Sequence, residues 1–133
     1  MIESAGGTIP FLCHVFLILF GGFFALNFVF NQNFAKNSFG YESKEAIYMG
    51  RPFGFLMLGL ILMLIATLFQ IGGFSSANEL ISVIFVFTVL GALYNLALYL
   101  KILPTHNGNP HDIKHFIRPL IPLTVIVIRF FTL

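Results

Sequence analysis

Four polar side chains stand out because each lies in, or at the edge of, a different long apolar stretch: His14, Gln70, Glu79 and Arg129. An imidazole or a carboxylate can take up and release a proton, and a guanidinium binds anionic groups. Ionisable side chains are costly within a bilayer unless they are paired or hydrated, so they are candidates for function. Together the four would form a site that binds a small molecule or a quinone, or that moves a proton. Glu79 and Arg129 would be its ion pair.

Both charged residues also have a purely structural explanation. Arg129 could extend its guanidinium to the lipid headgroups while its aliphatic stem stays in the apolar region. Glu79 could simply occupy the first turn of a helix, where the helix dipole favours a negative charge. Two amides further along their apolar stretches, Asn27 and Asn95, are expected to make hydrogen bonds between helices.

Three histidines follow the third apolar stretch, at His106, His111 and His115. If 111–118 is helical, His111 and His115 lie on one face, and a metal site with the third imidazole is conceivable. Lys114 in the same turn argues against it, so we predict no metal and expect these imidazoles to be solvated. His14 could ligate a pigment alone, which leaves a pigment- or metal-carrying subunit as a further alternative. No cofactor is otherwise predicted.

Little else in the chain is typical of catalysis. There is no Ser/His/Asp grouping at one level, no carboxylate pair within an apolar stretch and no phosphate-binding glycine loop after a strand, so we predict a protein that is not an enzyme. The one cysteine, Cys13, excludes an intrachain disulfide. The net charge of +2 is too small to indicate nucleic-acid binding.

The composition indicates which elements must position these residues. Of the 133 residues 58% are apolar and only 9% are charged, against about 25% charged in an average soluble domain. A soluble domain of this size could not cover its surface with so few charges. We therefore predict an all-α integral membrane protein, a four-helix bundle in one transmembrane domain.

A bilayer core needs about 20 apolar residues in a helix. The chain offers spans at about 10–30, 52–71, 78–100 and 115–133, the last being the weakest because it is short and contains Arg129. Pro10 and Pro52 suit the first turn of a helix. Six basic residues occupy the first and third loops, and none the N-terminus or the second loop: Lys36, Lys44, Arg51, Lys101, Lys114 and Arg118.

The positive-inside rule places loops 31–51 and 101–114 in the cytoplasm and both termini on the non-cytoplasmic side. The expected location is a bacterial inner membrane, or the inner membrane of an organelle. In this topology His14, Gln70, Glu79 and Arg129 share one level near the outer face.

Small residues recur in the spans. They let helix backbones approach closely in lipid, which supports a compact bundle. The candidate packing positions are Gly21, Ala25, Gly50, Gly54, Gly59 and Gly91.

The stretch from Tyr41 to Leu60 carries Tyr48, Gly50, Gly54 and Gly59 after an acidic and basic lead-in. It resembles the second helix of small bacterial DoxX-like and related uncharacterised four-helix membrane proteins. Arg51 and the longer histidine-rich loop depart from that pattern. The resemblance implies a fold more than a function, since such proteins mostly lack an assigned activity and some are accessory parts of redox systems.

The absence of a reaction centre favours a non-catalytic accessory or assembly subunit of a larger membrane complex. Its partners would be the lipid bilayer and either other membrane subunits or further copies of itself, with no nucleic acid. The alternative is the small-molecule, proton or quinone-binding protein that uses His14, Gln70, Glu79 and Arg129.

Overall fold

The chain folds as an all-α four-helix membrane bundle in a computed structural model that describes residues 1–31, 33–39, 43–105 and 110–133. Four helices are long and apolar enough to cross a membrane, which confirms the predicted class. The helical elements in chain order are α1 (Thr8–Phe30), α2 (Phe34–Phe39), α3 (Lys44–Leu68), η1 (Ile71–Gly73), α4 (Asn78–Tyr99) and α5 (Lys114–Thr132).

The second membrane helix differs from its predicted bounds at both ends. It begins at Lys44 because the Ser43 side chain caps it, with Oγ accepting from the Ala46 amide at 3.1 Å. Pro52 therefore lies inside α3 rather than at its start. The helix ends at Leu68, since Gln70 takes a left-handed conformation with φ of 55°. The predicted loop 31–51 also contains the short helix α2, which its polar composition did not indicate.

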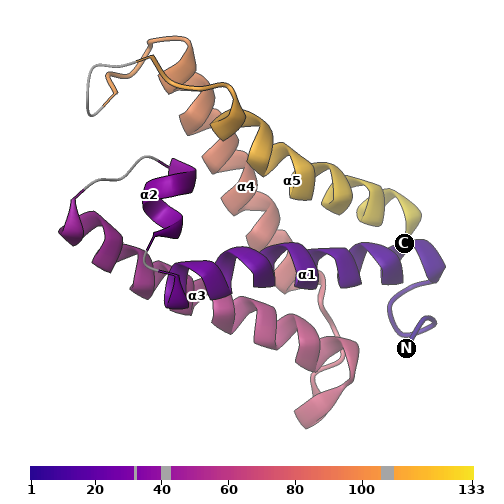
Figure 1. Ribbon diagram of the computed structural model, residues 1–133. Helices are drawn as coiled ribbons and strands as arrows, with labels where there is room; N and C mark the ends of the chain where they lie inside the picture. The colour runs from indigo at the N-terminus through magenta and orange to yellow at the C-terminus, as the bar shows by residue number, and fades with distance from the viewer. Residues whose placement is uncertain (32, 40–42, 106–109) are drawn as a thin grey trace.

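The helices form two antiparallel pairs, α1 with α3 and α4 with α5, which are joined mainly where α1 packs against α5 (Figure 1). The consecutive helices α3 and α4 contact each other much less. Both chain termini lie at one end of the bundle together with η1 (Figure 1). We call this the terminal end (residues 1–7, 69–77 and 133). The opposite end, with α2 and residues 100–105 and 110–113, is the loop end.

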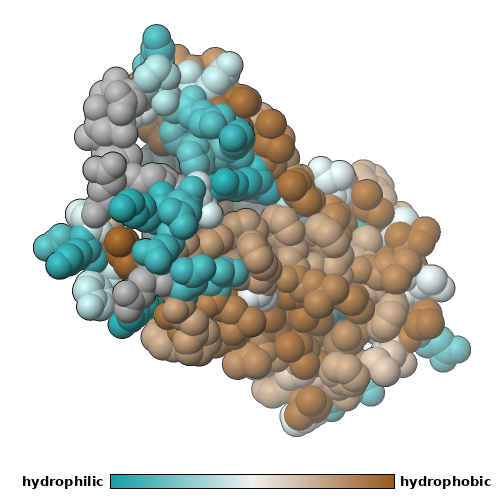
Figure 2. Space-filling model, viewed as in Figure 1, coloured by the Kyte–Doolittle hydropathy of each residue, from teal (hydrophilic) through white to brown (hydrophobic). Residues whose placement is uncertain are grey.

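The densest packing lies toward the terminal end. Buried residues of α3 follow helical spacing, at Ile61, Leu64 and Leu68, and Ile81 of α4 and Ile126 of α5 are fully buried beside them. Most other apolar side chains face outward, as expected for helices in lipid. Figure 2 shows this apolar surface over the bundle, with hydrophilic residues gathered at the loop end.

At the loop end, aromatic rings attach α2 to α1. The Phe34 ring packs edge-on against Phe28 and Phe24, with centroids 5.1 and 5.8 Å apart. Arg118 of α5 donates from Nη1 to the Ser38 carbonyl oxygen at 2.8 Å. Through these contacts α2 links the two helix pairs.

The helices α1 and α3 approach each other closely at Gly54. A Cβ atom there would lie 2.8 Å from Val29 Cγ2 and 3.1 Å from the Val29 backbone nitrogen. Three other predicted packing glycines lie against side chains of another helix: Gly21 faces Ile61, Gly50 faces Phe28 and Gly91 lies near Pro119. Ala25 is fully buried. A Cβ at Gly59, in contrast, would meet no described atom within 4 Å.

We predict opposite effects of alanine at Gly54 and Gly59. Both changes raise helix propensity equally, but only Gly54→Ala forces α1 and α3 apart, at a cost of about 1–3 kcal/mol. Thermal or denaturant unfolding in detergent, followed by circular dichroism, should place Gly54→Ala below Gly59→Ala in stability. Equal stabilities would contradict a close α1–α3 contact.

Candidate functional site

A cavity of about 270 Å³ opens at the terminal end, between the starts of α1 and α4 and the last turns of α3 and α5. Every long helix contributes to it, so the site depends on the whole bundle. Its polar lining consists of Glu3, Ser4, His14, Thr67, Ser75, Ser76, Asn78 and Arg129. We call it the terminal cavity.

His14 is buried, with 2% of its surface exposed. It lies on the buried face of α1 with Pro10, Cys13 and Leu17. Its Nε2 donates to the Leu64 carbonyl oxygen of α3 at 2.9 Å, and a carbonyl partner requires that this nitrogen carry the proton. The same carbonyl also accepts from the Thr67 hydroxyl at 2.9 Å. These bonds hold the imidazole at the cavity wall.

Arg129 is also buried, with 3% of its surface exposed. Nη2 donates to Asn78 Oδ1 at the start of α4, at 2.9 Å. Nε and Nη1 are buried and have no hydrogen-bond partner among the described residues. The guanidinium carbon lies 5.6 Å from the centroid of the Phe130 ring. A buried cation therefore lines the cavity with donor groups to spare.

The expected ion pair between Glu79 and Arg129 is wrong. The Glu79 carboxylate is exposed and accepts from the Ser76 hydroxyl at 2.8 Å. In the described part of the chain, Arg129 makes no ion pair with any carboxylate. Asn78 lies on the α4 face that carries buried Ile81, whereas Glu79 is rotated about 100° from it, which turns its side chain away.

Gln70 and Glu79 are not part of the terminal cavity. Gln70 lies beyond the end of α3 and lines an adjoining depression with Met1 and Phe69, which shares Glu3, Ser4 and Leu68 with the terminal cavity. The structure thus brings together two of the four predicted residues, His14 and Arg129. No sequence pattern indicated Glu3, Ser75 or Ser76 as site residues. Asn78 is only the first position of the predicted span 78–100 in the sequence, and it lies three residues before the buried Ile81.

The histidines at the loop end form a separate group. The Asn95 amide donates to the Gly91 carbonyl at 2.7 Å, so its Oδ1 is left to accept from His111 Nε2 at 2.9 Å. The His111 and His115 rings lie 4.8 Å apart. His106 lies outside the described residues. Among the described ones, no group of three or more His, Cys, Asp or Glu is placed to hold a metal.

The other interior amide, Asn27, donates to the Phe23 carbonyl at 2.7 Å. That contact lies within α1, not between helices.

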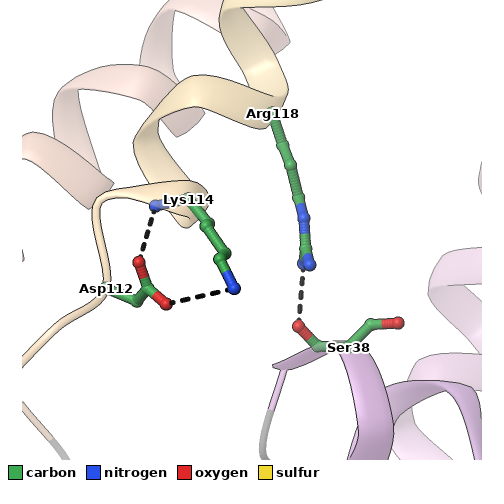
Figure 3. Close-up of polar contacts among 4 residues, drawn as sticks. All are labelled: Ser38, Asp112, Lys114 and Arg118. Carbon is green, nitrogen blue, oxygen red and sulfur yellow. Dashed lines mark hydrogen bonds and ion pairs between the residues drawn. The ribbon is translucent and has the colours of Figure 1, made fainter.

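Asp112 lies two residues before the start of α5, and its carboxylate accepts a hydrogen bond from the first residue of the helix (Figure 3). Its Oδ1 accepts from the Lys114 backbone amide at 3.0 Å, and its Oδ2 lies 3.9 Å from Lys114 Nζ. The backbone hydrogen bond is the main reason that the pKa of Asp112 lies below its ordinary value, and the positive charges of Lys114, His115 and Arg118 lower it further. This carboxylate organises the helix end and belongs to no cavity.

Comparison with family models, curated proteins and solved structures finds no match to this chain. The geometry of the chain itself therefore carries the functional argument.

We predict a pH-dependent effect of Asp112→Ala. Because the folded pKa is lowered, the carboxylate stabilises the fold above its unfolded pKa, and that stability is lost as the pH falls through the folded pKa. Asp112→Ala should therefore lower the melting temperature at neutral pH, and this deficit should shrink steadily at acidic pH, below the ordinary aspartate pKa of about 4. Asp112→Asn is the control, because its amide oxygen accepts the same bond at both pH values. A deficit of Asp112→Ala that is equal at both pH values would contradict the carboxylate cap.

Proposed function

We propose that this small polytopic membrane protein binds a small molecule in the terminal cavity. The observation that carries the proposal is Arg129, a buried cation that lines a cavity and keeps unpartnered donors on Nε and Nη1. Buried donors without partners are rare in folded proteins and call for an explanation such as a ligand or an ion. His14 supports the proposal, since its imidazole is fixed on the opposite helix pair and lines the same cavity.

Binding fits the geometry better than proton transfer does. A proton path needs titratable groups in a connected series, and Glu79 points outside the cavity. A guanidinium does not release its proton at ordinary pH. The wall offers fixed donors and hydroxyls, which are suited to holding a ligand.

The orientation is part of the proposal. Six basic residues lie at the loop end or in the helix turns next to it: Lys36, Lys44, Arg51, Lys101, Lys114 and Arg118. The positive-inside rule then puts the loop end in the cytoplasm and the terminal cavity on the non-cytoplasmic side of a bacterial or organelle inner membrane. Kinship with DoxX-like proteins also remains a proposal, supported by the pattern of Tyr48, Gly50, Gly54 and Gly59.

We predict that the protein extracted in mild detergent carries a small molecule that depends on the cavity. Native mass spectrometry should detect a bound mass, distinct from detergent, on the wild-type protein and on Gln70→Ala, which is changed outside the cavity. The double variant His14→Phe with Arg129→Met should lack this mass. A wild-type protein without a bound mass, or equal masses on all three proteins, would contradict the proposal.

A role as an accessory subunit is the second candidate. It is favoured by α4, which packs on α5 and much less on its neighbour α3. One side of α4 exposes apolar residues at helix-packing spacing, namely Val83, Val86, Phe87, Leu90, Leu93 and Tyr94. A helix of another subunit could lie on this face as readily as lipid.

The accessory role predicts a stable assembly in native membranes. Blue-native electrophoresis after mild extraction should show the wild-type chain in a larger complex. Leu90→Trp on the exposed α4 face should reduce that complex, whereas Leu19→Trp on the exposed side of α1 should not. A chain that migrates alone under every mild condition would contradict this role.

A further inference from the structure

We infer that the terminal cavity takes an oxyanion, a carboxylate or phosphate group, held by Arg129. The inference rests on the proposed function, because it names the chemical class of the small molecule. Three features of the cavity support the inference: its charge balance, the donors that surround it, and its size and depth in the bundle.

The charge balance is the first argument. The guanidinium is permanently positive, and it is almost completely buried. Among the residues that the structure describes, its one hydrogen-bond partner is Asn78 Oδ1, which is neutral. In the described residues no carboxylate forms an ion pair with Arg129. Burying a cation without a counter-charge is strongly unfavourable, and an oxyanion supplies that counter-charge directly.

The arrangement of donors is the second argument. Nε and Nη1 are free, and Nη2 has a second hydrogen besides the one given to Asn78. A guanidinium presents its N–H groups in planar pairs that match two oxygens of a carboxylate or phosphate. Ser75 also lines the cavity and can add a hydroxyl donor.

The backbone adds further donors. The cavity touches Gly6 and Ala77, which lie just before α1 and α4, and neither helix has a side-chain cap at its start. The first N–H groups of a helix lack intrahelical partners and favour anions. The last turns of α3 and α5 bring carbonyl groups to the same end. The carbonyl oxygens of Leu64 and Ile128 accept hydrogen bonds from threonine hydroxyls. These bonds weaken the repulsion between those oxygens and a bound anion.

Size and depth limit the ligand. At about 270 Å³ the cavity is slightly smaller than the range of roughly 300–1,000 Å³ that holds drug-sized ligands. It lies where all four long helices begin or end, which is the level that headgroups would occupy around helices long enough to span a bilayer. A soluble phosphate or carboxylate and the phosphate of an anionic lipid would both fit this chemistry.

Glu3 is the internal competitor. Its carboxylate lines the cavity without an ion pair to Arg129. If an external oxyanion binds, removing this negative charge should tighten binding. If Glu3 itself serves as the counter-charge, Glu3→Gln should destabilise the protein to the same extent as Arg129→Gln.

The test uses the full chain in a neutral detergent and measures its melting temperature with sodium phosphate, with sodium acetate and with chloride of equal ionic strength. A ligand that binds only the folded state raises the melting temperature. We expect phosphate or acetate to raise it for the wild type and more strongly for Glu3→Gln. The shift should be smaller for Arg129→Lys, which lacks the planar donors, and absent for Arg129→Met.

Two controls keep the test decisive. Arg118→Gln changes an arginine at the opposite end and should keep the full anion response. Without added anion, Arg129→Met should melt no lower than the wild type, because it removes a buried unpaired charge. A large destabilisation of Arg129→Met together with a wild type that does not respond would overturn the inference.

A lipid source is tested in parallel in nanodiscs. Native mass spectrometry should show retention of phosphatidylglycerol over phosphatidylcholine, with loss of that preference in Arg129→Met, if the oxyanion is a lipid headgroup. No response to phosphate or acetate and no lipid preference would overturn the oxyanion inference. If a short-chain ubiquinone then stabilised the wild type but not Arg129→Met, the small-molecule proposal would stand and only its anionic character would fall.

Discussion

A guanidinium enclosed by apolar helices needs a counter-charge or hydrating partners, and this requirement dominates the terminal end of the bundle. Arg129 is buried among elements that are far apart in sequence, and its one hydrogen bond is to a neutral amide at the start of α4. Charged groups removed from water without a partner are strongly unfavourable. The packing that buries Arg129 is therefore maintained at a cost in stability, and a bound counter-ion would offset that cost.

The position of α1 makes this burial possible. It approaches α3 closely at Gly54 and also packs against α5, so it joins the two helix pairs. The same helix brings His14 to the Leu64 carbonyl, which fixes one wall of the cavity. At the other end the pairs are linked by α2, through Phe34 on α1 and through Ser38 to Arg118 on α5. One end of the bundle encloses a polar cavity, while the other presents its charges to water.

Sequence reasoning located the spans and the level of the site but could not determine the rotation of each helix. Hydropathy gives the depth of a residue, which is why His14 and Arg129 were both expected near the same end. The helix α4 is apolar on all sides, so nothing in its pattern distinguishes the face of Asn78 from that of Glu79, one residue and about 100° apart. Gln70 was misplaced for another reason, since the backbone turns at that residue and ends α3 earlier than hydropathy suggests.

The sequence left two explanations for Arg129 open, a role in a site and extension of its charge to the headgroups, and its position in the structure distinguishes them. A residue that extends its charge to the headgroups would expose its guanidinium at the outer surface of the helix. Arg129 instead lies on the buried face of α5 with Pro122 and Ile126, and only 3% of its surface is exposed. The loop arginines differ in this respect, because Arg51 lies over the Tyr48 ring and Arg118 donates to a backbone carbonyl near solvent. Those residues underlie the proposed orientation in the membrane, whereas the unused donors of the buried Arg129 support the proposal that a ligand enters the cavity.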